Sequence, residues 1–122
     1  MENLSKGQIE AEVSKAIIKF EREHMGRGPK EVKTHLIGDI VFVRLKGVLT
    51  SAEQQLAKND GGMELIKRVR ANLLENSKLL LEQIICSITE TKLISMHTDI
   101  STITGERVIL FTVAEDLERK FK

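Results

Sequence analysis

The chain has 122 residues, of which 19 are basic and 18 acidic, and a formal net charge of +1. This balance disfavours nucleic acid or an anionic membrane as an obligatory partner, and four Phe without Trp or Tyr leave few stacking platforms for single-stranded nucleic acid. The single cysteine, Cys86, excludes an internal disulfide, and the most apolar run, residues 79–88, is about half as long as a membrane span. We expect one cytoplasmic domain over residues 1–122, without a transmembrane segment.

The first predicted element is an amphipathic helix over about residues 5–24. Its apolar residues recur at helical spacing, and Ser5 with Gln8 fits a capping box. Glycines and the only proline then predict a loop over residues 25–30.

A β-hairpin is predicted over residues 32–45, around the turn pair Gly38-Asp39. This register puts apolar side chains on one face and a mainly polar set on the other, which a slip of one residue would scramble. The predicted cross-strand pairs are Leu36 with Val41, Thr34 with Val43, Val32 with Leu45, Ile37 with Ile40, His35 with Phe42 and Lys33 with Arg44.

Two further helices are predicted after this hairpin. Thr50 and Glu53 form a capping box for a short helix that runs to about residue 58. After the breaker at residues 59–62, a helix over about residues 63–90 would be about 42 Å long, which exceeds the width of a domain of this size. It should therefore overhang the sheet or break near Asn76-Ser77.

A second hairpin is predicted over residues 93–113, around Thr104-Gly105, with a short helical tail over residues 114–122. We therefore expect an α+β fold: an antiparallel sheet of two hairpins, packed on one face by the long helix and the N-terminal helix. The predicted pairs in this hairpin are Ile100 with Ile109, Thr98 with Phe111, Met96 with Val113, His97 with Thr112, Asp99 with Leu110 and Ser101 with Val108.

The second half of the long helix has more apolar side chains than one sheet face can cover. An overhanging apolar helix end is normally buried in another subunit, so the pattern predicts a homodimer. The alternative is a kinked helix that folds back on the first helix. The predicted dimer contacts are Leu80, Leu81, Ile84, Ile85 and Ile88.

Two segments are candidate ligand sites. The loop containing Arg27, Gly28 and Lys30 offers flexible backbone amides and basic groups to an anion, although a helix stop explains it as well. His97 and Asp99 lie two apart on a strand, so they share a face on which they could bind a ligand. A metal site would need further ligands, and an exposed polar sheet face explains the pair equally well.

The sheet face opposite the helices is the predicted partner surface. A few exposed apolar residues are ordinary, but five together on one face favour an interaction site. These five are Ile37, Ile40, Phe42, Val108 and Leu110.

Nothing in the sequence requires catalysis or a cofactor. Cys86 has no CxxC partner, and a buried free cysteine usually acts as a small hydrophobe. The motifs of zinc proteases and of serine hydrolases are absent from the sequence. We therefore expect neither an enzyme nor a resident metal.

A combination of short motifs over nearly the whole chain resembles the MpsC family. Thr91 departs from the pattern, since a glycine would be expected before the third strand. The motifs are Gly26-Arg27-Gly28-Pro29, Gly38-Asp39, Val43, Leu45, Gly47, Leu49-Thr50, Ala52-Glu53, Arg68, Arg70, Leu93-Ile94-Ser95, Asp99 and Phe111-Thr112-Val113.

The family is named for a sodium-translocating, membrane-potential-generating system. The resemblance implies a small soluble protein encoded alongside membrane machinery for ion or inorganic-carbon uptake. We therefore expect an accessory or regulatory protein that acts through protein contacts, docked on a membrane complex at the inner face of the membrane. The alternative is a small-ligand or anion sensor that uses the loop at residues 26–30 or the face with His97 and Asp99. A third alternative is a metal-dependent enzyme.

Overall fold

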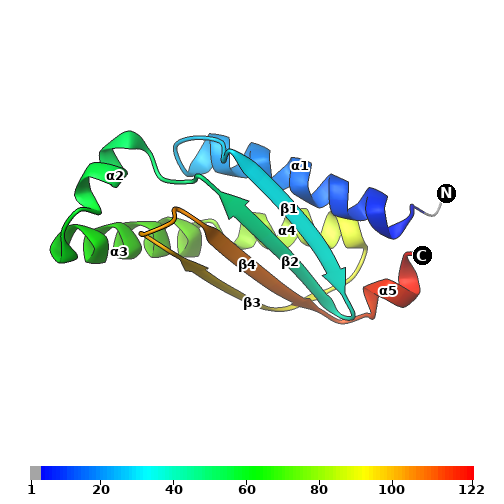
Figure 1. The fold of residues 1–122 in the computed structure, drawn as a ribbon. Helices are drawn as coiled ribbons and strands as arrows, with labels where there is room; N and C mark the ends of the chain where they lie inside the picture. Colours follow the sequence, from blue (N-terminus) through cyan, green and yellow to red (C-terminus); the bar gives the residue numbers. More distant parts are fainter. Residues whose placement is uncertain (1–3) are drawn as a thin grey trace.

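The computed structural model describes residues 4–122 as an α+β fold with a four-stranded antiparallel sheet, which confirms the predicted fold class (Figure 1). Each predicted hairpin is present, and the predicted long helix is divided in two. The elements in chain order are α1 (Lys6–His24), β1 (Glu31–Ile37), β2 (Ile40–Lys46), α2 (Ser51–Leu56), α3 (Asp60–Asn76), α4 (Lys78–Thr89), β3 (Leu93–Ile100), β4 (Arg107–Val113) and α5 (Leu117–Lys120).

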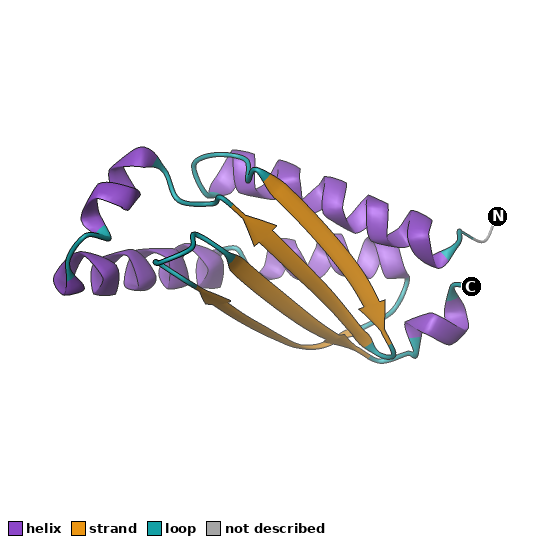
Figure 2. Cartoon of the chain, in the orientation of Figure 1, coloured by secondary structure: helices purple, strands orange, loops and turns teal. Residues whose placement is uncertain are grey.

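The two hairpins lie side by side in the strand order β1-β2-β4-β3. Strands β2 and β4 pair in the centre, and β1 and β3 form the edges. Helices α1 and α4 pack on one face of the sheet, behind the strands in the view of Figure 2. Within residues 4–122 no helix covers the opposite face, which we call the open face.

Helix α1 begins with the predicted capping box, in which the Ser5 hydroxyl accepts from the Gln8 amide and the Gln8 side chain accepts from the Ser5 amide. Its apolar stripe is buried against the sheet. The Glu10 carboxylate also accepts a hydrogen bond from the Leu36 amide at 2.8 Å, which ties α1 to the edge strand β1. The buried residues on the stripe are Ile9, Val13, Ile17 and Phe20.

The first hairpin has the predicted register, from Val32 opposite Leu45 to Ile37 opposite Ile40. The two-residue turn fixes this pairing, with Gly38 in the left-handed region at φ +57°. The predicted tail contains α5, and the Leu117 amide donates to the Gly38 carbonyl at 2.7 Å.

The register predicted for the second hairpin is wrong by two residues. Ile100 lies opposite Arg107 rather than opposite Ile109. The turn is longer than a two-residue Thr104-Gly105 pair, because the Ser101 amide donates to the Glu106 carbonyl at 2.8 Å and closes a loop over residues 102–105. A shift of two residues is even, so every side chain keeps its predicted face.

The long helix breaks at Ser77, as predicted, and α4 then packs on α1. The second half of the predicted helix therefore lies against the chain itself, whereas its first half, α3, extends beyond the sheet (Figure 1). Leu81 and Ile85 are fully buried in the chain's own core, which corrects their assignment as dimer contacts. Helix α4 ends at Glu90 with φ 55°, so the left-handed position falls before Thr91 and no glycine is needed there.

Helices α2 and α3 form an arm that extends beyond one end of the sheet (Figure 1). The predicted capping box of Thr50 and Glu53 starts α2. The Asn59 side chain caps α3 by accepting from the Gly62 amide at 2.7 Å. Gly62 is buried against the Leu56 backbone, where a Cβ atom would overlap the Leu56 carbonyl oxygen.

We predict that Gly62→Ala lowers the free energy of unfolding by at least about 2 kcal/mol, because the backbone of α2 must move to admit one methyl group. Thermal and urea unfolding of the variant, followed by circular dichroism, measure this change.

Gly61→Ala is the matched control, since the neighbouring Gly61 is exposed and has room for a Cβ atom. Its stability should stay within about 1 kcal/mol of the wild type, with any change towards greater stability because alanine favours a helix. Equal losses in the two variants would contradict close packing at Gly62.

Candidate functional site

All five residues of the predicted partner surface lie on the open face. Phe42 and Leu110 are directly opposite each other on the central strands. Ile37 is 55% exposed, while Ile40 and Val108 are partly buried by their neighbours. The open face therefore has an apolar centre, and no helix within residues 4–122 covers it.

Charged side chains border this apolar centre. Arg44 pairs with Glu106 at 2.8 Å, and Glu31 lies 3.7 Å from Lys46 and 3.9 Å from Lys33. Exposed ion pairs of this kind contribute only about 0–1 kcal/mol each. These ion pairs therefore position the charged side chains on the surface more than they stabilise the fold.

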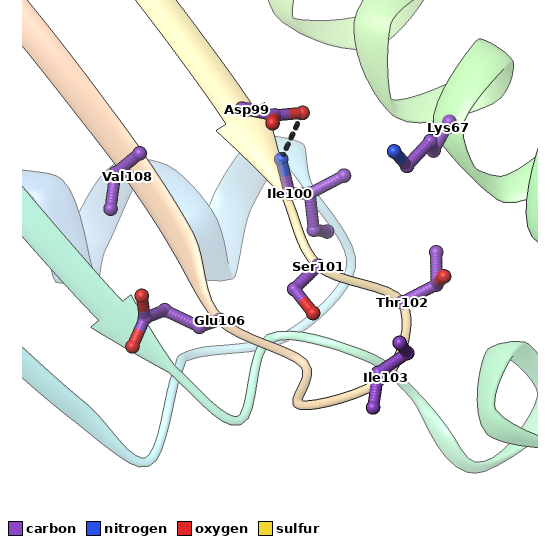
Figure 3. Close-up of a pocket in the computed structure, with 8 residues that line it drawn as sticks. All are labelled: Lys67, Asp99, Ile100, Ser101, Thr102, Ile103, Glu106 and Val108. Atoms are coloured by element: carbon purple, nitrogen blue, oxygen red, sulfur yellow. Dashed lines mark hydrogen bonds between the residues drawn. The ribbon is translucent and has the colours of Figure 1, made fainter.

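His97 and Asp99 share the open face on β3, as predicted, but the sheet does not bring a third ligand to them. His35 lies on β1, three strand spacings away, which is about 14 Å. The Asp99 carboxylate turns back on its own strand and accepts from the Ile100 amide at 2.8 Å (Figure 3). Among residues 4–122, no three His, Cys, Asp or Glu side chains are grouped as metal ligands.

A small hollow of about 330 Å³ lies where β3 ends and β4 begins, with Lys67 from α3 on its far side (Figure 3). Both Asp99 and Glu106 line it together with Lys67. Its lining mixes both charge signs, so it does not favour an anion.

A larger cleft of about 550 Å³ lies between the arm and the loops at the end of the sheet. We call it the lysine cleft because Lys30 and Lys58 line it, with the hydroxyl-bearing Thr102 and Thr104 and no carboxylate in its lining. Lys30 belongs to the predicted anion loop, whereas Arg27 and Gly28 do not line the cleft. The structure thus separates Lys30 from the rest of that loop.

The remaining predicted dimer contacts lie where α4 meets α1. Leu80 and Ile84 line a narrow groove beside Phe20, and Ile88 lines a neighbouring hollow on α1. All three residues are partly buried and pack against the core. Most of their apolar surface is therefore accounted for within the chain.

A buried charge cluster joins the arm to the sheet. Glu21 from α1 is fully buried, and its two carboxylate oxygens lie 3.9 Å from Arg70 and 4.0 Å from Arg107. These distances allow charge attraction but are too long for hydrogen bonds. Arg70 also binds Glu53 of α2 through two hydrogen bonds, at 2.7 and 2.9 Å, and donates to the Val48 carbonyl at 2.8 Å.

The two carboxyl groups of the buried charge cluster respond to burial in opposite ways. Burial raises the pKa of Glu21, and Arg107 and Arg70 offset this only in part. Partial burial also acts to raise the pKa of Glu53, but hydrogen bonds from Arg70 and the Thr50 backbone lower it overall. The stabilisation from Glu53 is therefore lost as pH falls through its folded-state pKa, whereas that from Glu21 is present at low pH and lost as pH rises through its raised value.

The sequence interpretation missed this cluster, although a signal was present. Arg70 stands on the apolar stripe of α3, four residues from both Ile66 and Leu74. Arg107 occupies an inward position of β4, and Glu21 stands one helical turn after Ile17. A charge at an inward position of three separate elements indicates that the charges meet.

None of the helices formed by residues 4–122 combines the length and the apolar character that crossing a bilayer requires.

Comparison with known proteins gives one family and one close relative. The sequence model of the MpsC family, described as "Na+-translocating membrane potential-generating system (MpsC)", matches residues 5–115. The chain is 44% identical over 118 residues to "Uncharacterized protein YbcI" of Bacillus subtilis (strain 168), covering 97% of this chain and 95% of that protein. No solved structure matches the chain.

We predict that Arg70→Met lowers the free energy of unfolding by about 3–5 kcal/mol, because it leaves Glu21 buried with one guanidinium fewer and removes the hydrogen bonds to Glu53. Urea unfolding at neutral pH measures this loss.

Arg68→Met is the matched control on the same helix, since Arg68 is exposed. Its stability should stay within about 0.5 kcal/mol of the wild type. An Arg70→Met protein as stable as this control would show that the buried charge cluster does not hold the arm.

Proposed function

Because the chain belongs to the MpsC family, we propose that it is an accessory protein of a sodium-translocating, membrane-potential-generating system and acts through protein contacts rather than by catalysis. In this proposal it docks from the cytoplasmic side on membrane-embedded components for ion or inorganic-carbon uptake. The family description supports the setting, and the finding that no helix of residues 4–122 could cross a bilayer supports a docked rather than an embedded component.

The open face is the observation that carries this proposal. Phe42 and Leu110 form an adjacent pair in its centre, and Ile37 is 55% exposed beside them. Apolar residues gathered on one uncovered face mark protein contact sites. The proposed contact therefore needs the centre of the sheet and not the helix layer.

We predict that the double substitution Phe42→Asp with Leu110→Asp abolishes the association, because it places two charges in the apolar centre. The tagged chain is isolated from detergent-solubilised membranes of its native cell, and co-purifying proteins with membrane spans are identified by mass spectrometry. The wild type should bring such a component with it, and the double variant should not.

Leu79→Asp is the control, since Leu79 is 67% exposed on α4, away from the open face. It should retain the association, and all three proteins should show the same circular dichroism spectrum. If the double variant still co-purifies with the membrane component, the open face is not the contact surface.

The lysine cleft favours a second candidate function, the sensing of a small anion. Lys30 and Lys58 approach one space, its lining has no carboxylate, and its volume of about 550 Å³ falls within the range of small-molecule sites. The Lys30 side chain lies across Gly47, where a Cβ atom would come within 2.7 Å of it. The close packing at this glycine supports a fixed course for the lysine stem.

For this candidate we predict that an anion raises the melting temperature of the wild type in a thermal-shift screen of phosphate, bicarbonate and nucleotides. A ligand at a hundred times its Kd would add about 2.7 kcal/mol, which is a shift of several degrees. Lys30→Gln should lose the shift, and Lys33→Gln, outside the cleft, should keep it. No shift with any of these anions would remove the candidate.

A further inference from the structure

The sheet register arranges the side chains of the open face in rows that cross all four strands. The central row has the apolar pair Phe42 and Leu110 between two histidines. The next row towards the arm contains Lys33, Arg44, Val108 and Asp99, in strand order. The row on the other side contains Ile37, Ile40, Thr112 and Ser95.

The charges of the open face are divided between the two hairpins. On the first hairpin the three basic residues Lys33, Arg44 and Lys46 exceed the single acidic residue Glu31, which leaves this half basic. On the second hairpin the charged residues are acidic, namely Asp99 on β3 and Glu106 just before β4. Each half of the face thus has the charge that would attract the other half.

From this division we propose that a second copy of this chain covers the open face, related by a two-fold axis that runs parallel to the strands between β2 and β4. The inference rests on the proposed function, which makes the open face a contact surface, and it adds that in the free protein a second copy covers this surface until the membrane component takes its place. Rotation about this axis lays each first hairpin over the second hairpin of the other copy. Phe42 of one copy then meets Leu110 of the other, and Lys33 faces Asp99.

The other in-plane axis gives a poor match. A two-fold axis along the central row would reverse the order of the rows, so that Lys33 would face Ile37 and Arg44 would face Ile40. Both Lys33 and Arg44 would then be desolvated against apolar side chains. The axis parallel to the strands leaves only Arg44 against an apolar side chain, that of Val108, and gives Lys33 a carboxylate, so the charges favour this axis.

Two sheets can meet in this way at about 10 Å separation, with strand directions about 30° apart. The product is a four-layer particle in which two sheets are enclosed by two helix layers. Four strands of about seven residues give a face of about 19 by 23 Å. Because this is a small interface, association should be measured at concentrations up to about 100 μM.

We predict that Lys33→Glu and Asp99→Lys each weaken self-association on the order of tenfold, because each turns two symmetric attractive pairs into repulsive ones. The double variant, which exchanges the two charges, should recover the wild-type affinity. Sedimentation equilibrium over a dilution series measures the dimer Kd of each protein.

A control variant and a disrupting variant test the surface itself. Lys15→Glu reverses an exposed charge on α1, far from the open face, and should leave the Kd unchanged. Phe42→Asp with Leu110→Asp should be monomeric and keep its circular dichroism spectrum. A double charge exchange that fails to restore dimerisation overturns the proposed axis.

A wild type that is monomeric at 100 μM, or a dimer that Phe42→Asp with Leu110→Asp leaves intact, overturns this inference. The proposed function fails separately. If the wild type is monomeric but Phe42→Asp with Leu110→Asp loses the membrane component, the proposed function stands and the dimer is rejected. If the wild type is dimeric but co-purifies with no membrane component, the dimer stands and the proposed function is rejected.

Discussion

A buried charge cluster, in which Glu21 lies between the guanidinium groups of Arg70 and Arg107, joins the helix layer, the arm and the sheet. One charge comes from each of α1, α3 and β4, and Arg70 extends the link to α2 through Glu53. Burying such a group adds little net stability, but removing one partner leaves an uncompensated charge in the interior. These contacts therefore link the arm of α2 and α3 to one end of the sheet.

The placement of the helices leaves one face of the sheet uncovered within residues 4–122. With the arm held at the end of the sheet, α1 and α4 form the helix layer, and both lie on the same face. The tail cannot cover the other face either, because α5 is bound to the first hairpin turn through Leu117 and Gly38. The open face is thus the surface that the arm, the helix layer and α5 leave uncovered.

The sequence predicted the fold class and the first hairpin because local rules determine them. A two-residue turn at Gly38-Asp39 permits one register, whereas Gly105 ends a longer loop, and the sequence alone did not reveal its length. That error did not change which residues are predicted on the open face, because an even shift in register leaves every side chain on the same face of the sheet. The buried charge cluster escaped prediction because periodicity shows that Arg70 points inwards, but not that Glu21, which lies 49 positions earlier in the chain, faces it.

A surface that served only solubility would intersperse charges of both signs and avoid a shared apolar centre. The open face instead combines Phe42 and Leu110 with basic groups on one hairpin and acidic groups on the other. Buried apolar area contributes affinity but does not favour one orientation of a partner. Separated charges favour one orientation but add little affinity. In the proposed contact, the two together would favour one orientation of the partner.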